Sequence, residues 1–264
     1  MAVLIDIDNL CKTFDRGRTF AVREVSLAVE GGAFLVLLGA SGSGKTTTLK
    51  CINRLVEPDS GEVRIAGEPV GAGDPTALRR RIGYVFQGIG LFPHMSVGEN
   101  IGITPQLLGW PPVEIGARVE ALLDLVELPR SYASRYPATL SGGEQQRAGV
   151  ARAIAARPRI VLMDEPFGAL DPLTRDVVGS AYRALHDRLG LTTIMVTHDM
   201  QEAVLLADRI AVMQAGRILA HDTPRALMST PVHSEVAALM DMPRRRAERI
   251  RAISEGHPAG DSHE

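Results

Sequence analysis

GASGSGKTT, at residues 39–47, decides the fold class of this chain. It matches the phosphate-binding pattern GxxxxGK[ST], in which glycines let the backbone curl so that its N–H groups point at phosphate oxygens. Lys45 is placed to reach the β- and γ-phosphates of a nucleotide, and Thr46 offers a hydroxyl to Mg²⁺. The helix that follows presents its positive N-terminus to the same anion.

This phosphate loop also has the sequence context that the pattern requires. The apolar run AFLVLLG (33–39) precedes it, and apolar residues recur at helical spacing after it. A Gly/Ser-rich turn is the alternative, but a chance match in a chain of this length is on the order of one in a hundred. The residues predicted to bind ATP here are Gly39, Ala40, Ser41, Gly42, Ser43, Gly44, Lys45, Thr46 and Thr47.

Two adjacent carboxylates end a second hydrophobic run, RIVLMDEP (159–166). Asp164 is placed to hold Mg²⁺ through water, as in other P-loop enzymes. Glu165 is placed to orient and polarise an attacking water molecule. Acidic pairs at strand ends are also common as plain surface residues, so this motif gains its meaning from the phosphate loop.

Three apolar runs predict the centre of the fold: residues 33–39, 159–165 and 192–198. Each is rich in Val, Ile and Leu and lacks polar alternation, which is typical of parallel strands covered on both faces. Ligands collect at the carboxyl ends of such strands. We therefore expect an α/β fold, a P-loop NTPase core with a mixed, mainly parallel sheet.

An antiparallel β layer is expected beside this sheet. Residues 3–7 and 20–29 alternate and are separated by a polar DRGR turn. Two further short runs, RIGYVF (81–86) and RIAVM (209–213), are assigned to the same layer. Between about residues 88 and 158 the pattern becomes helical, which predicts a helical insert subdomain between two pieces of the core.

Composition and charge exclude several classes of function. The 264 residues carry 29 basic and 31 acidic side chains, so no global basic field would draw the chain to nucleic acid. Cys11 and Cys51 have no CxxC spacing, which indicates neither a disulfide scaffold nor a zinc site and fits a cytoplasmic setting. The apolar runs are far shorter than the ~20 residues that span a bilayer, so we expect any membrane role to act through a partner.

A third motif, LSGGEQQR (140–147), resembles the signature sequence of ABC ATPases and is almost specific to them. A Ser-Gly-Gly turn that opens a helix is a second anion site. The resemblance implies that this signature segment of one subunit closes on the γ-phosphate held by another, so we expect a homodimer around two Mg-ATP. The ATP-binding residues implied here are Ser141, Gly142, Gly143 and Glu144.

The resemblance covers residues 3 to about 240 and assigns roles to four more side chains. Gln87 looks like the glutamine that contacts Mg²⁺ and water, and His198 like the histidine that touches the γ-phosphate and Glu165. Asp171 looks like the loop aspartate at the dimer interface, and Phe14 like the aromatic residue that stacks on adenine, where many relatives have Tyr. The predicted sets are catalytic Lys45, Gln87, Glu165 and His198, and Mg²⁺-binding Thr46, Gln87 and Asp164.

The implied domain is an ABC nucleotide-binding domain at residues 1–240, with core pieces 1–87 and 159–240 around the insert 88–158. Residues 241–264 are expected to form an Arg-rich segment and a disordered polar tail. The resemblance also implies a location on the cytoplasmic face of the membrane, against an integral membrane permease that is served by an extracellular solute-binding protein.

Several strings resemble the ATPases of osmoprotectant importers, which take up quaternary amines such as glycine betaine, choline or carnitine. They are CINRLVEPDSGEV (51–63), IGLFPHMSVGENI (89–101), QLLGWP (106–111) and RYPATLSGGEQQR (135–147). None of these strings binds solute, so an importer of amino acids or another small polar solute stays open. Many osmoprotectant ATPases continue into paired CBS domains, for which this chain has no room, so regulation through such domains is not expected.

Non-transport ABC ATPases are less favoured. DNA-repair members carry a long coiled coil between the phosphate loop and the signature, but no sustained heptads lie between Lys45 and Ser141. Translation-associated members carry two cassettes in one chain, and only one is present in this sequence.

Overall fold

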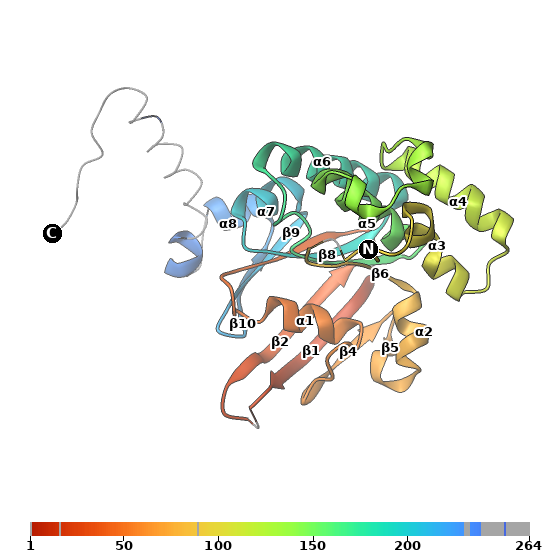
Figure 1. The fold of residues 1–264 in the computed structure, drawn as a ribbon. Helices are drawn as coiled ribbons and strands as arrows, with labels where there is room; N and C mark the ends of the chain where they lie inside the picture. Colours follow the sequence, from red (N-terminus) through yellow and green to blue (C-terminus); the bar gives the residue numbers. More distant parts are fainter. Residues whose placement is uncertain (1, 16, 89, 230–232, 239–250, 252–264) are drawn as a thin grey trace.

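The computed structural model describes residues 2–15, 17–88, 90–229, 233–238 and 251. Two β-sheets lie one above the other in Figure 1, with helices packed on and between them. The predicted tail at 241–264 lies outside the described residues, apart from Arg251. In the part of the chain that the structure describes, no helix combines the length and the apolar character needed to cross a bilayer.

The larger sheet has the order β10-β9-β3-β8-β7-β6. Its central strand β3 pairs in parallel with both β8 and β9, and β8, β7 and β6 continue the parallel pairing. The three predicted buried runs are therefore neighbours, with every residue of β3, β7 and β8 buried. The strands are β3 (Phe34–Leu38), β6 (Ile82–Val85), β7 (Ile160–Asp164), β8 (Thr192–Thr197), β9 (Arg209–Gln214) and β10 (Arg217–Asp222).

The assignment of 81–86 and 209–213 to an antiparallel layer is wrong. β6 pairs in parallel with β7, and β9 pairs in parallel with β3 and antiparallel only with the edge strand β10. The four central residues of β9 are buried in succession rather than alternately, as in a strand covered on both faces. The interpretation failed because RIGYVF holds Gly83 and Tyr84 among its apolar residues, and because RIAVM leads into the β9–β10 hairpin, which is antiparallel.

The smaller sheet is the antiparallel layer, with the order β2-β1-β4-β5. Its strands β1 and β2 are longer than predicted, and β2 buries alternate residues, including Val25, Leu27 and Val29. The sequence reasoning did not identify β4 or β5. The strands are β1 (Val3–Thr13), β2 (Phe20–Glu30), β4 (Ser60–Ile65) and β5 (Glu68–Pro69).

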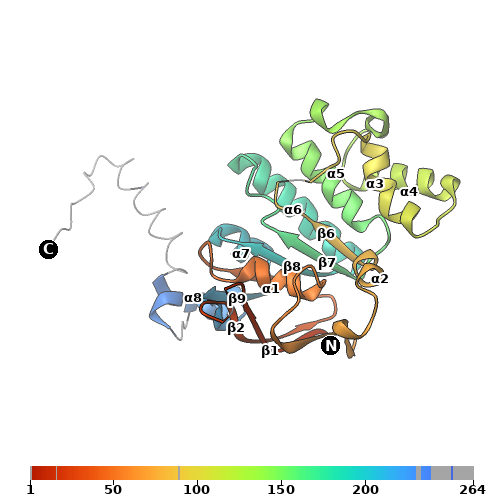
Figure 2. The same cartoon turned by 60° about the horizontal axis from the view of Figure 1, so that its bottom comes forward.

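Side chains of β3 point alternately into two apolar cores. Leu35 and Leu37 join the small sheet and helix α1 (Lys45–Ile52), which lies between the sheets in Figures 1 and 2. Phe34, Val36 and Leu38 join the core on the opposite face. That face is covered by α5 (Gly142–Ile154), α6 (Pro172–Leu189) and α7 (Met200–Leu206).

Helices α3 (Val97–Leu107), α4 (Pro112–Leu125) and α5 follow one another between β6 and β7, on the right of Figure 1. Val119, Leu122 and Leu123 form the buried face of α4. Short elements complete the fold: η1 (Val70–Ala72), α2 (Pro75–Arg80), η2 (Arg130–Ser134), η3 (Pro137–Thr139) and α8 (Pro224–Ser229). The phosphate loop leaves the carboxyl end of β3, in the middle of the large sheet, and the helical segment is inserted between β6 and β7.

His186 gives the fold a pH-dependent stability. Its ring is buried, with Nδ1 3.0 Å from Thr193 Oγ1 and Nε2 3.2 Å from Gly32 O. Burial, and then the nearby Arg183, lower the pKa of His186. Below about pH 6.5 the unfolded chain therefore binds a proton that the folded chain resists, and the free energy of unfolding falls.

We expect the urea midpoint to drop as the pH falls from about 6.5 to about 5. His186 should lower the free energy of unfolding by at most about 1.4 kcal/mol per pH unit. His186→Gln should show a shallower drop, although burial lowers the pKa of His221 as well and leaves part of the effect. Equal slopes in wild type and variant would contradict this role for His186.

Candidate functional site

The phosphate loop leaves β3 and turns at once into α1. Ser43 N donates to Ala40 O at 3.2 Å, and Thr48 N donates to Gly44 O at 2.9 Å in the first helical turn. Gly44, the residue before the helix, has φ 100°, a left-handed conformation that favours glycine. The glycines of the motif thus serve the turn that the sequence predicted.

Backbone atoms of two other segments pack directly against the phosphate loop. A Cβ atom at Gly39 would lie 2.2 Å from Met213 O, and one at Gly44 would lie 2.3 Å from Ala21 O in β2. On the same side, Gly216 N in the β9–β10 turn donates to Ser43 O at 3.1 Å. The loop therefore has no room for side chains at these two glycines.

Lys45 is 4% exposed and folds back over its own loop. Its Nζ donates to Gly39 O at 2.7 Å and Ala40 O at 2.8 Å. Burial lowers the pKa of Lys45, and the nearby charges of Glu165 and Asp164 oppose that shift. A buried ammonium group held by carbonyl dipoles, rather than by a contacting carboxylate, is suited to meet an incoming anion.

Asp164 ends β7 directly beside the phosphate loop. Its Oδ1 accepts from the Thr46 hydroxyl at 2.8 Å, and its Oδ2 accepts from the Tyr84 hydroxyl at 3.4 Å. Burial raises the pKa of Tyr84, so this phenol stays protonated and donates. Sequence reasoning missed Tyr84; the adjacent strand RIGYVF contained it, but only the β6–β7 pairing shows that it reaches Asp164.

Glu165, one residue later, is the meeting point of three segments. Gln87 Nε2 lies 3.4 Å and His198 Nδ1 3.3 Å from Glu165 Oε2. The backbone of Glu165 has φ 43°, which is uncommon for a residue with a side chain. Gln87 and His198, which are 111 positions apart in the chain (198 − 87), therefore converge on one carboxylate; the sequence analysis expected this contact for His198 and did not foresee it for Gln87.

Thr46, Asp164 and Gln87 fit a magnesium site by their chemistry. Hydroxyl, carboxylate and amide oxygens are the hard donors that Mg²⁺ prefers, and this ion usually keeps several waters beside one or two protein ligands. Among the described residues no group of three or more His, Cys, Asp or Glu side chains could hold a metal ion.

The signature segment lies apart from this cluster. Ser141 caps α5, and Glu144 completes a reciprocal capping box: Ser141 N and Ser141 Oγ donate to Glu144 Oε2 at 2.7 and 2.9 Å. These hydrogen bonds, with a weaker one from Tyr132, lower the pKa of Glu144. No hydrogen bond or ion pair among the described residues links the segment to the phosphate loop. Ser141 and Gly142 are exposed, so they are open to another molecule.

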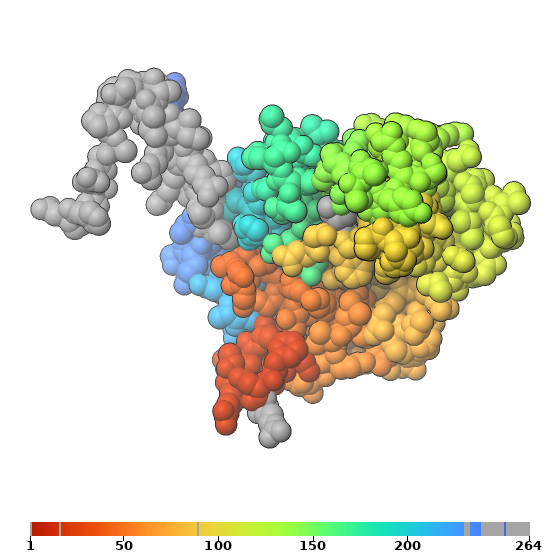
Figure 3. All heavy atoms as spheres, viewed as in Figure 1, coloured from red at the N-terminus to blue at the C-terminus, as the bar shows by residue number. Residues whose placement is uncertain are grey.

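Asp171 and Phe14 also lie outside the cluster. Asp171 is the exposed N-cap of α6 and accepts from Thr174 N at 3.1 Å. Phe14 is 68% exposed in the turn between β1 and β2, which projects at the lower edge of Figure 3. An open hollow of about 560 Å³ beside it is also lined by Phe20, a second aromatic residue that the sequence reasoning did not consider.

The loop that follows Gln87 is built on a buried amide. Asn100, fully buried in α3, accepts from Phe92 N at 2.7 Å and donates to the carbonyls of Phe92, Met95 and Ser96 at 2.9–3.1 Å. Arg152 of the signature helix donates to Gly90 O at 2.7 Å. This arrangement leaves Phe92 41% exposed at the surface. Asn100 lies in the quoted string 89–101 and Arg152 lies outside the quoted strings, but the sequence analysis gave neither residue a role.

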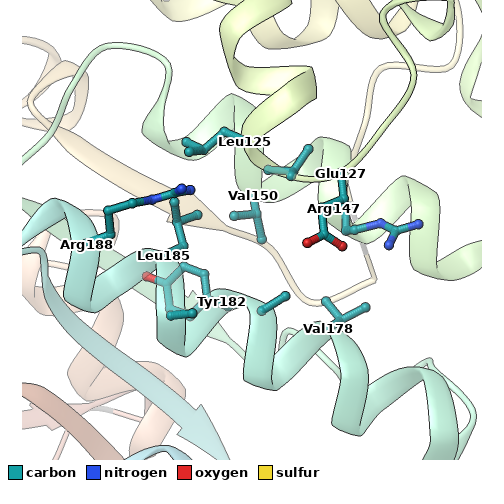
Figure 4. A pocket seen from close by; sticks show the side chains of 11 residues that line it. Leu125, Glu127, Arg147, Val150, Val178, Tyr182, Leu185 and Arg188 are labelled. Atoms are coloured by element: carbon teal, nitrogen blue, oxygen red, sulfur yellow. The ribbon is translucent and has the colours of Figure 1, made fainter.

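A cavity of about 260 Å³ lies where the helical segment meets α6 (Figure 4). Leu125 and Val150 line it on one side, and Val178, Tyr182 and Leu185 on the other. None of the predicted site residues lines it. Its mainly apolar walls indicate an imperfectly filled seam between subdomains rather than a catalytic pocket.

The comparison with protein families identifies this arrangement. A family model described as "ABC transporter" matches residues 22–168, more than half of the chain. The chain belongs to the ABC transporter family. A solved dimeric structure of a bacterial ABC transporter cassette is similar to this ABC protein with a TM-score of 0.75 and 33% identity, over 83% of this chain and 98% of that one. The predicted α/β fold of a P-loop NTPase is confirmed.

Curated relatives agree with the resemblance to osmoprotectant importers. This ABC protein is 49% identical over 228 residues to the choline transport ATP-binding protein OpuBA of Bacillus subtilis, over 86% of this chain and 60% of that protein. It is 48% identical over 233 residues to the carnitine transport ATP-binding protein OpuCA of Listeria monocytogenes, over 88% of this chain and 58% of that protein. The chain thus spans about three fifths of the length of these relatives.

Two glycines of the phosphate loop provide a matched test of its packing. Gly44→Ala should destabilise the protein by roughly 2–4 kcal/mol, because it combines left-handed strain with a clash against Ala21 O. Gly42→Ala, at φ 78° with no atom within 4 Å of the new Cβ, should cost only the strain, about 1–2 kcal/mol. Urea unfolding would measure the stability of both variants, and binding of a fluorescent ATP analogue would report on the loop itself. Equal losses in the free energy of unfolding would argue against the packing described.

Proposed function

We propose that this chain is the ATP-hydrolysing subunit of an ABC importer. The observation that carries the proposal is the convergence of Lys45, Thr46, Asp164 and Glu165 at neighbouring strand ends. An anion-binding loop, a hard-ligand site and a carboxylate that can face water are the three parts that phosphoryl transfer to water requires.

In the proposed reaction, water attacks the γ-phosphorus of ATP and releases ADP and phosphate. Lys45 and the amides of the phosphate loop bind the β- and γ-phosphates and stabilise their charge. Glu165 orients and polarises the attacking water, and His198 holds Glu165 and contacts the γ-phosphate. Thr46, Asp164 and Gln87 would hold Mg²⁺, which when bound neutralises phosphate charge.

Each ATP is proposed to lie between two copies of the chain. The exposed capping turn at Ser141 and Gly142 offers an anion site that its own phosphate loop does not use. A second copy could present this turn, with Gly143, Glu144 and Asp171, to the nucleotide on Lys45. The similarity to a dimeric cassette supports this arrangement. Phe14 is proposed to stack on adenine from the β1–β2 turn.

The proposed membrane partner is a permease that docks on the loop after Gln87. The exposed Phe92, held by Asn100 below it, gives an apolar anchor suited to a helix in a groove. The chain would then lie on the cytoplasmic face of the membrane and draw solute from an extracellular binding protein. The proposed core is residues 1–87 and 159–240, with the insert at 88–158.

The proposed solute is a quaternary amine osmoprotectant such as choline, carnitine or glycine betaine. The similarity to OpuBA and OpuCA supports this choice, since these are choline and carnitine transport proteins. The solute itself would not touch this subunit.

Complementation between two variants tests the shared site. Lys45→Ala should weaken ATP binding about tenfold or more, because a charge-assisted hydrogen bond contributes about 1.5–3 kcal/mol. Ser141→Arg should leave binding to the monomer intact and abolish ATP-driven dimerisation. Each variant alone should be inactive, whereas their mixture should regain ATP hydrolysis, because a heterodimer holds one complete site. A mixture that stays inactive, or equal losses of monomer affinity, would refute a site shared between copies.

Uptake of labelled solutes tests the substrate class. In cells that lack other routes, uptake of choline, carnitine or glycine betaine should depend on this chain and vanish with Lys45→Ala, since transport then has no hydrolysis to drive it. If a deletion strain loses uptake of an amino acid or an anion while all quaternary amines still enter, the substrate proposal fails. The proposed ATPase activity would survive that result, because it rests on the site residues.

A further inference from the structure

Arg175, in the first turns of α6, contacts three groups that flank the proposed catalytic cluster. Its Nη1 donates to Asp199 Oδ2 at 3.0 Å, and its Nη2 donates to Leu170 O at 3.1 Å. Its Nε lies 3.6 Å from Glu202 Oε1, an ion-pair distance. One guanidinium thus joins the loop before Asp171 to the first turn of α7.

The partners of Arg175 hold both neighbours of His198. The Thr197 hydroxyl donates to Glu202 Oε2 at 2.6 Å, and Asp199 N donates to Thr197 Oγ1 at 3.0 Å. Asp199 also caps α7 by accepting from Gln201 N at 2.7 Å. The residues before and after His198 are therefore fixed by a network that ends on Arg175.

The same guanidinium closes a ring of contacts that starts and ends at Glu165. Gly168 N donates to Glu165 O at 3.3 Å, which fixes the start of the loop that leads to Leu170. Leu170 O in turn accepts a hydrogen bond from Arg175. From Arg175 the ring passes through Asp199 to His198, whose Nδ1 lies 3.3 Å from Glu165 Oε2. A shift of Arg175 would move both the loop of Asp171 and the imidazole of His198.

A buried carboxylate such as that of Glu202 is unusual at a position where only packing is required. Its side chain is 7% exposed, and burial raises its pKa, an effect that the Thr197 hydrogen bond opposes. Buried ion pairs are often matched or exceeded in stability by apolar side chains of similar volume, whereas they fix geometry through directed hydrogen bonds. The network therefore serves position more than stability.

We propose that Arg175 is a positioning residue that couples the Asp171 loop to His198, so that contact made by a second copy at Asp171 sets the imidazole against Glu165. This inference rests on the proposed ATPase function. Arg175 itself touches neither Glu165 nor the phosphate loop in any contact among the described residues, so it acts through Asp199 and Glu202.

The same helix carries a matched control. Arg183 is 27% exposed, close to the 24% of Arg175. It donates to Leu206 O at 2.7 Å and pairs with Asp187 and Asp208, each at 2.9 Å. Arg183 thus holds the C-terminal end of α7, and Arg175 holds its N-terminal end. If docking of α7 were the only role, the two arginines would be equivalent.

The test compares Arg175→Gln, Arg175→Lys and Arg183→Gln, with Glu165→Gln as the inactive reference. Arg175→Gln should lower kcat by roughly 10- to 100-fold, as small misplacements of catalytic groups do, while affinity of the monomer for ATP changes less than about twofold. Arg175→Lys, which cannot reach three partners at once, should rescue only part of the loss. Arg183→Gln should lower the melting temperature at least as much and keep kcat within about twofold of wild type.

A second readout does not need hydrolysis. In NMR spectra of protein with labelled histidine, the His198 ring signal should shift or broaden in Arg175→Gln and stay in place in Arg183→Gln. Equal kcat and unchanged His198 signals in both variants would overturn the inference. If wild type does not hydrolyse ATP, the proposed function fails, and the His198 signals still decide whether Arg175 positions that ring.

Discussion

Direct backbone contact between the phosphate loop and its neighbours is the constraint on which the site depends. Gly44 meets Ala21 O of the small sheet, and Gly39 meets Met213 O of the large one, at distances that exclude a Cβ atom. The shape of the loop is therefore fitted to backbone from both sheets. β3 leads into the loop and α1 packs in the core of the small sheet, so the anion site is continuous with that core.

Continuous burial made the large sheet predictable. The runs that become β3, β7 and β8 are rich in Val, Ile, Leu and Met and show no regular polar alternation, which is typical of strands covered on both faces. The same reasoning failed for β6, whose run holds Gly83 and Tyr84 among its apolar residues, and for β9, which leads into an antiparallel hairpin with β10. β4 was missed because its sequence, SGEVRI, buries only Val63 and carries a weak signal; its place is set by pairing with β1.

The residues of the candidate site also fall into two groups, those that the sequence predicts and those that only the structure reveals. Lys45, Thr46, Asp164 and Glu165 stand in motifs whose spacing reflects the chemistry, so they could be found in the chain alone. Supporting side chains such as Tyr84 and Asn100 could not, because their roles arise from strand pairing and loop packing between distant segments. Ser141 and Asp171 were predicted as site residues, yet one copy of the chain leaves them on its surface, and the part proposed for them requires a second molecule.

The left-handed backbone at Glu165 has a consequence for how this protein can change over generations. A residue with a Cβ atom in that conformation costs about 1–2 kcal/mol, which glycine would recover and asparagine would partly recover. Natural selection for stability alone would therefore drive this position toward glycine or asparagine, at the expense of the carboxylate. Such a replacement would remove the carboxylate that the proposed hydrolysis needs. The strained glutamate is therefore expected to persist only while that carboxylate is useful to the cell.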